Sequence, residues 1–256
     1  MATILPGFMG YLNFAGLGIP FDSASVARDQ SLFLPDLMVG DPDRIGWAYG
    51  QRLVTGSFSG PIPVADVSNL WAWAFSRNAD GTLTNSGDLT IEYFYDEGII
   101  WENCKINSMS FSVSAGDIAN YSIDVMGLGE GSGTVGRMDC EDTTPTLITW
   151  RECAFGSTPF ISGFEISIAN NLQPAFVVSS AANFYPDALV ESPRTITGNI
   201  QQYGVDVPPA NGNVTVSFGS FNINAQNVIF HGRAPAANPS TVISTYNYTA
   251  VCDQEL

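Results

Sequence analysis

The feature that most constrains this sequence is a strand, turn and strand pattern in residues 160–200. In residues 163–169, Phe164, Ile166 and Ile168 alternate with Glu165 and small residues. A period of two predicts a strand with one buried face. Two asparagines and a proline then break the strand, and a second alternating segment, Arg-Thr-Ile-Thr-Gly-Asn, ends the pattern. Such punctuation predicts a turn between two strands.

The first half of the chain carries a degraded copy of this pattern. Three segments match in the same order: residues 10–21 with 163–176, residues 33–37 with 184–188, and residues 52–57 with 194–199. We interpret the matches as an internal duplication, and it predicts two domains, residues 1–140 and 145–256. The glycine-rich segment 127–145, with five glycines and four acidic residues, is interpreted as a flexible linker between them. The alternative is a long hairpin loop within one larger sandwich.

Alternating segments elsewhere predict further strands. Each half ends in paired strands: residues 107–113 with 121–125 in the first, and in the second 214–218, 228–230 and, after a proline-rich loop, 241–251. The 25 glycines and 15 prolines agree with many short strands joined by turns. The predicted fold class is mainly β, with two tandem antiparallel sandwiches or partly closed barrels.

One helix is predicted, over residues 66–77 of the first half. Asp66 is a suitable N-cap, and an apolar stripe follows at helical spacing: Val67, Leu70, Trp71, Ala74 and Phe75. The corresponding segment of the second half contains Pro208 and Pro209, which prevent a helix. We expect Leu70 and Trp71 to pack on a sheet, and Val54 and Ile196 to be buried because they occupy the same place in matched strands.

The charge of the chain limits its partners. Twenty-five acidic and nine basic residues give a formal charge of −16. Nucleic-acid binding needs lysine and arginine to displace counterions, so specific DNA binding is not expected. No segment has the composition of a signal peptide or a membrane span, and we expect synthesis in the cytosol and no membrane partner.

No catalytic, metal or cofactor site is predicted. The single histidine, His231, has no nucleophile motif, and the four cysteines have no metal-ligand spacing, so buried free thiols are the expectation. Trp71, Trp73 and nearby carboxylates leave open a carbohydrate-binding or adhesin module, and less readily a β-sandwich hydrolase.

A strand ending in Asn-Asn-Leu, followed by a Pro-Asp corner and a Thr-Gly strand, resembles the tail tube (major tail) proteins of tailed bacteriophages. The resemblance implies a structural virion protein, made in the host cytoplasm and located in the tail. It implies six-fold rings, stacked into a tube, in which sheets of neighbouring subunits join into one barrel around viral DNA. The expected partners are other copies of the chain, other tail proteins and DNA that passes without specific binding. Two copies per chain predict a trimeric, pseudo-six-fold ring, with a hexamer of chains as the alternative.

The acidic charge suggests a channel wall that repels DNA, since like charges repel over about a Debye length. Candidate lumen residues are those on the polar faces of predicted strands: Glu92, Asp96, Asp124 and Glu165. The alternative is that these carboxylates keep the outer surface soluble.

Overall fold

A computed structural model describes residues 11–14, 17–33, 48–75, 87–93, 97–134, 145–177, 184–204, 209–238 and 241–252. The first half contains β1 (Tyr11–Phe14), β2 (Leu17–Ile19), β3 (Ser23–Phe33), β4 (Ala48–Pro61), α1 (Val67–Phe75), β5 (Gly87–Tyr93), β6 (Glu97–Ser114), β7 (Asn120–Gly127) and β8 (Gly129–Thr134). The second half contains η2 (Trp150–Glu152), β9 (Cys153–Phe155), β10 (Ile161–Ala169), β11 (Gln173–Ala175), β12 (Ala188–Val190), β13 (Thr195–Tyr203), β14 (Gly212–Phe218), β15 (Phe221–Asn238) and β16 (Thr241–Cys252).

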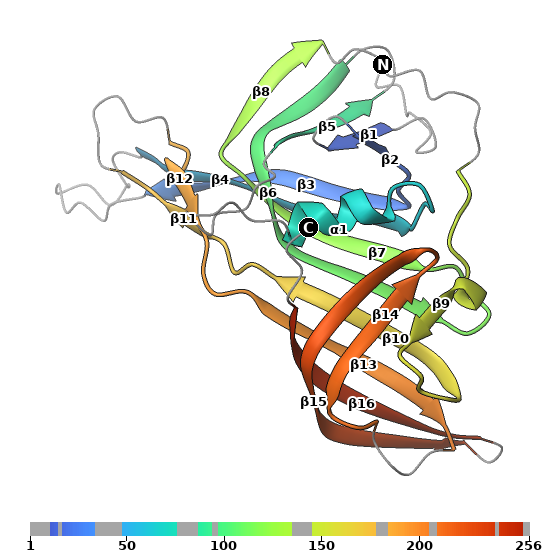
Figure 1. Ribbon diagram of the computed structural model, residues 1–256. Coiled ribbons are helices and arrows are strands. Elements are labelled where there is room, and N and C mark those ends of the chain that lie inside the picture. The colour runs from blue at the N-terminus through green and yellow to red at the C-terminus, as the bar shows by residue number, and fades with distance from the viewer. Residues whose placement is uncertain are drawn as a thin grey trace.

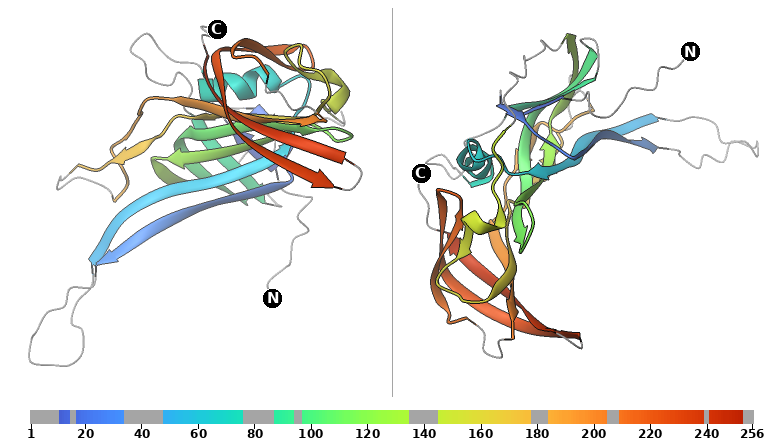
Figure 2. Two further views of the ribbon diagram at one scale, coloured as in Figure 1. Left: turned by 90° about the horizontal axis from the view of Figure 1, so that it is seen from below. Right: turned by 90° about the vertical axis from the view of Figure 1, so that its right-hand side faces the viewer.

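Fourteen of these strands form one curved antiparallel sheet, and β11 and β12 form a separate two-stranded sheet (Figure 1). The mainly β fold predicted from the sequence is confirmed. The hairpin of β3 and β4 projects beyond the body of the sheet (Figure 2).

The order of strand pairing is the same in both halves. In the first half the hydrogen-bonded order is β3, β4, β7, β6, and in the second it is β10, β13, β16, β15. The pairing of β6 with β10 joins the two sets into one sheet. This order supports the predicted duplication.

Shorter elements repeat as well. β1 pairs with β5 in the first half, as β9 pairs with β14 in the second. β5 and β14 each lead into a strand of 18 residues, β6 and β15. Each long strand has a register shift near its middle, at 106/108 in β6 and at 231/233 in β15. The exact domain boundary stays a prediction, because residues 135–144 lie outside the described ranges.

One of the three sequence matches is wrong. Tyr11 and Leu12 were aligned with the start of β10, but they belong to β1, which pairs with β5 and not with β4. By its pairing, the counterpart of β10 is β3, because Val26 lies opposite Gly56 as Ile166 lies opposite Gly198. The two segments share a glycine followed by an aromatic residue, and this short motif does not determine which strand pairs with which.

The predicted linker is partly structured. Residues 129–134 form β8, which pairs with residues 97–102 of β6. The side chain of Glu102 lies over the glycines of β8. A Cβ at Gly131 would be 2.6 Å from Glu102 Oε1, and one at Gly129 would be 3.0 Å from Oε2.

The proline-rich loop predicted after Phe230 is also wrong over residues 231–238, which continue β15 alongside β16. Pro235 lies within this stretch. Proline is tolerated in a strand where its missing N–H faces no ladder partner, which is the situation at a free edge.

The core lies on one face of the sheet and continues from one half into the other. One row of paired residues on this face crosses six strands: Phe58, Ile123, Met109, Ile168, Ile196 and Ala250. Helix α1 covers this face, with Trp71 5.6 Å from the ring of Phe111. The predicted stripe is buried, and so is Trp73. Val54, Ile196, Leu70 and Trp71 are all buried.

Truncation of the matched valine and isoleucine is expected to destabilise the chain. Val54 is 0% exposed and Ile196 is 5% exposed, so alanine at either position leaves a cavity. We expect each variant to lose about 1–4 kcal/mol of unfolding free energy, measured by urea denaturation of the soluble subunit. Thr197→Ala, on the exposed face of the same strand as Ile196, is the control. A loss as large in the control would contradict this account of the core.

Candidate functional site

The face of the sheet opposite the core is polar over most of its width. One row of paired residues on it crosses the same six strands: Ser59, Ser122, Ser110, Ser167, Thr197 and Thr249. These residues alternate with the core row along each strand, as the pleat of a sheet requires. Short hydroxyl side chains therefore line this row.

Two of the predicted lumen residues, Asp124 and Glu165, lie on this polar face. Asp124 is on β7 and accepts a hydrogen bond from Ser108 Oγ on β6. Glu165, on β10, accepts a hydrogen bond of 2.8 Å from Asn199 Nδ2 on β13. Both carboxylates are therefore oriented by neighbouring strands. By register, Asp29 of β3 lies on the same face, and the sequence analysis did not single it out.

The other two predicted residues, Glu92 and Asp96, remain predictions. Glu92 is on β5, where it lies opposite Tyr11 and Gly98 in the part of the sheet beyond the polar row. Asp96 lies outside the described residues. The sequence pattern showed that each carboxylate alternates with apolar neighbours, but it did not show which strands share a face.

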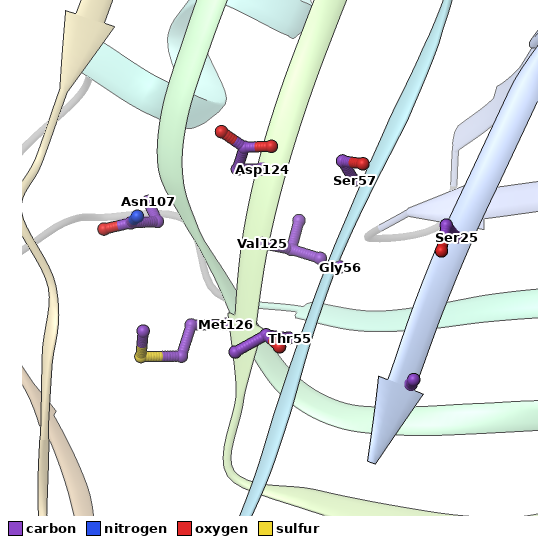
Figure 3. Close-up of a pocket in the computed structure, with 9 residues that line it drawn as sticks. Ser25, Thr55, Gly56, Ser57, Asn107, Asp124, Val125 and Met126 are labelled. Carbon is purple, nitrogen blue, oxygen red and sulfur yellow. The ribbon is translucent and has the colours of Figure 1, made fainter. Parts of the chain in front are cut away.

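A shallow hollow of about 410 Å³ lies on the polar face. Figure 3 shows Ser25, Ser57 and Asp124 on three neighbouring strands at its floor, with Asn107 and Met126 at one end. Its lining of hydroxyls, one carboxylate and small apolar groups contains no cation. It therefore offers no positive charge to a phosphate.

The basic residues whose contacts are described are held in ion pairs or ring contacts, including Lys105, which lies opposite Met126 on the polar side of β6. Arg28 lies 2.8 Å from Glu130, and Lys105 lies 2.8 Å from Glu191, both pairs measured from nitrogen to carboxylate oxygen. Three other arginines stack on aromatic rings: Arg52 on Phe184 and Tyr185, Arg151 on Trp150, and Arg194 on Phe75. These contacts leave Asp29, Asp124 and Glu165 as charged groups of the polar face.

The two asparagines after β10 form a junction between the helix and the sheet. Asn170 is fully buried, and its Nδ2 donates to the carbonyl oxygens of Ala74 and Ile106, at 3.0 Å each. Asn171 has a positive φ of 51° and donates to Pro193 O. Sequence reasoning identified this Asn-Asn pair only as a strand breaker, although asparagine is among the few non-glycine residues that readily adopt such a φ.

Exposed apolar side chains occur at both ends of the strands. Four lie at the end where β10 begins and β13 ends: Ile118, Trp150, Phe160 and Tyr203. Phe160 is 71% exposed and has a φ of 59°, which is unusual for an aromatic residue. Three more lie between β10 and β13 at the opposite end: Val177, Phe184 and Val190. Both ends thus offer apolar contact surface.

The described residues show no site for chemistry. No group of three or more His, Cys, Asp or Glu within them is placed to hold a metal ion. Cys104 is a buried free thiol, and burial raises the pKa of the free Cys153 thiol to about 12. No helix in the described part of the chain is long and apolar enough to cross a membrane.

The fold and the polar face together define a β-rich protein with a structural role. A profile of phage tail tube proteins matches residues 34–250, which is most of the chain. The chain therefore belongs to the phage tail tube family, as the sequence motifs predicted, and its place is the virion tail. A search of curated proteins gave no match.

Proposed function

We propose that this protein forms the rings of a phage tail tube and that the polar face of its large sheet lines the channel. The single observation that carries the proposal is the repeated strand order, β3-β4-β7-β6 followed by β10-β13-β16-β15. Each chain contributes two four-stranded sets with the same pairing order, side by side in one sheet. Three chains then supply six such sets, which corresponds to a pseudo-six-fold ring, and the subunit carries two tandem copies of one fold.

The polarity of the two faces supports this orientation. The apolar face is covered by α1 and by the strands that curl over it, so it is not available to a channel. The opposite face carries serine, threonine and asparagine with a few carboxylates. Lys105 on this face is neutralised by its ion pair with Glu191, so the wall offers little positive charge to grip a phosphate backbone. We propose that DNA passes along it during ejection without specific binding.

The exposed apolar residues at the two ends of the strands support stacking of rings. If the strands run along the tube, these ends face the rings above and below. Residues that are apolar and exposed in one subunit are then covered by the next ring. Assembly in the host cytoplasm, together with other tail proteins, is part of the same proposal.

Electron microscopy of the purified protein tests the proposal. Tubes or stacked rings with three chains per ring and pseudo-six-fold density support it. Six whole chains per ring would leave the second copy as an outward decoration and would contradict the pseudo-six-fold arrangement. Discrete monomers at high concentration, combined with glycan binding, would favour the alternative of a carbohydrate-binding or adhesin module. Glycosidase turnover would favour a hydrolase.

Reversal of charge on the polar face is expected to slow DNA release while leaving assembly intact. One chain has a formal charge of −16, so three chains carry three times that, −48. Asp124→Lys places an exposed cation on the polar face, where phosphates pass. The delay in ejection should shrink as salt rises, because the Debye length falls from about 10 Å at 0.1 M to about 3 Å at 1 M.

The control is Asn69→Lys, which adds a lysine on the exposed side of α1, on the opposite side of the sheet, and changes the charge by one unit where Asp124→Lys changes it by two. Release kinetics are followed by the fluorescence of a DNA dye in the medium. Equal delays in both variants, or a delay that does not depend on salt, would contradict the assignment of the polar face to the channel.

A further inference from the structure

Apart from the short outer strands β2, β8 and β9, the described sheet has two strand edges without a partner. β3 pairs with β4 on one side only. β15 pairs with β16 along most of its length, but its other side pairs with β14 only as far as Val228. Residues 229–238 of β15 therefore have no strand partner on this side, although the N–H of Phe230 donates to Asn211 Oδ1 at 3.0 Å. Two such edges on one chain are unfavourable in isolation, because unpaired N–H and C=O groups attract other strands.

The chain itself contains an example of how these edges are satisfied. In the middle of the sheet, residues 108–114 of β6 pair antiparallel with residues 163–169 of β10. β6 is the last strand of the first set, as β15 is the last strand of the second. β10 is the first strand of the second set, as β3 is the first strand of the first. The β6–β10 contact thus joins the last strand of one unit to the first strand of the next.

The register of this contact can be transferred to the free edges. Gly56 and Gly198 are matched, and the residues opposite them fix the other strands: Val26 corresponds to Ile166, and Val125 to Tyr248. Val125 lies opposite Ile106 of β6, and Tyr248 lies opposite Phe230 of β15. Counting onward from these two residues, past the register shift in each strand, gives the correspondence between β6 and β15. Phe111 of β6 then corresponds to Pro235 of β15.

We infer that residues 229–238 of one copy pair antiparallel with β3 of the next copy, with Ala237 opposite Ala24 and Ala236 opposite Ser25. The inference rests on the proposed function, because it names the contact that joins chains within a ring. In this register Ala234 lies opposite Ala27. The pairing joins the sheets of successive chains without a break and leaves neither edge exposed.

The residue types at the proposed contact fit it, with two exceptions. Alanine and serine at the paired positions allow close approach, and Asp29 lies beside His231 and Gly232. Pro235 has no N–H, so the proposed contact has at most one backbone donor fewer than the β6–β10 contact within the chain. Arg28 and Arg233 lie opposite each other, an unfavourable pair. The ion pair of Arg28 with Glu130, at 2.8 Å, offsets this repulsion.

Disulfide crosslinking tests the register. In a background with Cys140 and Cys252 replaced by serine, two double variants are made: Ala24→Cys with Ala237→Cys, and Ser25→Cys with Ala236→Cys. Successive pairs in an antiparallel ladder alternate between Cα separations of about 5.5 and 4.5 Å. Both distances lie within the range of disulfides, about 4.4–6.8 Å, and the pair without ladder hydrogen bonds brings its side chains closer.

The expected result is that at least one in-register variant gives covalent dimers and trimers on a non-reducing gel after assembly. Ala24→Cys with Ala234→Cys is the out-of-register control and should stay monomeric. Efficient crosslinking of this control would overturn the register. Tubes that form without crosslinks in either in-register variant would overturn the inference and leave the proposed function standing.

Hydrogen exchange of the unmodified protein provides a test that needs no variant. Protection of backbone amides in β3 and in residues 229–238 is expected to rise on assembly, because these edges become paired. Fast exchange at both edges in assembled tubes would overturn the inference. Absence of rings or tubes from the unmodified protein would instead count against the proposed function.

Discussion

Replacement of Gly198 by valine is expected to prevent stable folding of the second half of the chain. A Cβ at this position would overlap the carbonyl oxygen of Glu165 and the ring of Tyr248. The first of these is backbone of the neighbouring strand and cannot move aside without breaking the β10–β13 ladder. The tyrosine is held as well, because its hydroxyl donates to the same Glu165 carbonyl at 2.9 Å.

The expected loss of unfolding free energy is more than about 4 kcal/mol, which is beyond the usual effect of a point substitution. Thr197→Val is the matched control, since it places the same side chain at the neighbouring, exposed position of β13. We expect it to change stability by about 0.5 kcal/mol or less. Circular dichroism with urea denaturation measures both. Near-equal stability of Gly198→Val and the control would show that the strands do not approach so closely.

Gly56 gives the same argument in the first half. A Cβ there would overlap the carbonyl oxygen of Ser25 and the backbone of Val26. The two glycines occupy matched positions in the pairing order. The sequence reveals them as part of a recurring Thr-Gly pair, but the requirement for glycine comes from a neighbouring strand far along the chain. Sequence reasoning alone cannot supply that contact.

The parts of the fold that were predictable are those set by local pattern. The stripe of α1, from Val67 to Phe75, was found because helical spacing and burial coincide within nine residues. The β6–β7 hairpin was found because Met109 and Phe111 alternate with serines on one side of a short turn, and Ile123 alternates with polar residues on the other.

The parts that failed depend on pairing between distant strands. β1 was matched to the wrong strand because its position is set by β5, about 80 residues later, and not by its own sequence. The end of β15 was interpreted as a loop because Pro235 usually breaks strands, whereas a free edge tolerates it. The same limit applies to the polar face: Asp124 and Glu165 share it through the β6 strand between them.

Replacement of Asn170 by aspartate is expected to destabilise the chain strongly and in a pH-dependent way. The side chain is fully buried, and its Nδ2 group satisfies two carbonyl oxygens at once, one at the end of α1 and one on β6. Aspartate has nearly the same shape, but its ionised carboxylate cannot donate a hydrogen bond to either of the two carbonyl oxygens. We expect a loss of about 3–5 kcal/mol near neutral pH, as for an uncompensated buried charge.

The sign of the pH dependence follows from the folded environment. Burial next to two carbonyl oxygens raises the pKa of the introduced carboxyl in the folded state above its unfolded value of about 3.9. The protonated carboxyl can donate to one carbonyl, so the deficit relative to the unmodified protein is smallest below pH ~3.9 and grows as pH rises through the folded pKa. Asn170→Ala removes the donor without adding a charge, and its smaller loss, about 1–3 kcal/mol, should not vary with pH. Denaturation of the three proteins between pH 4 and 8 separates the two effects. A deficit in Asn170→Asp that stays constant over this range would mean that the asparagine does not bridge the helix and the sheet.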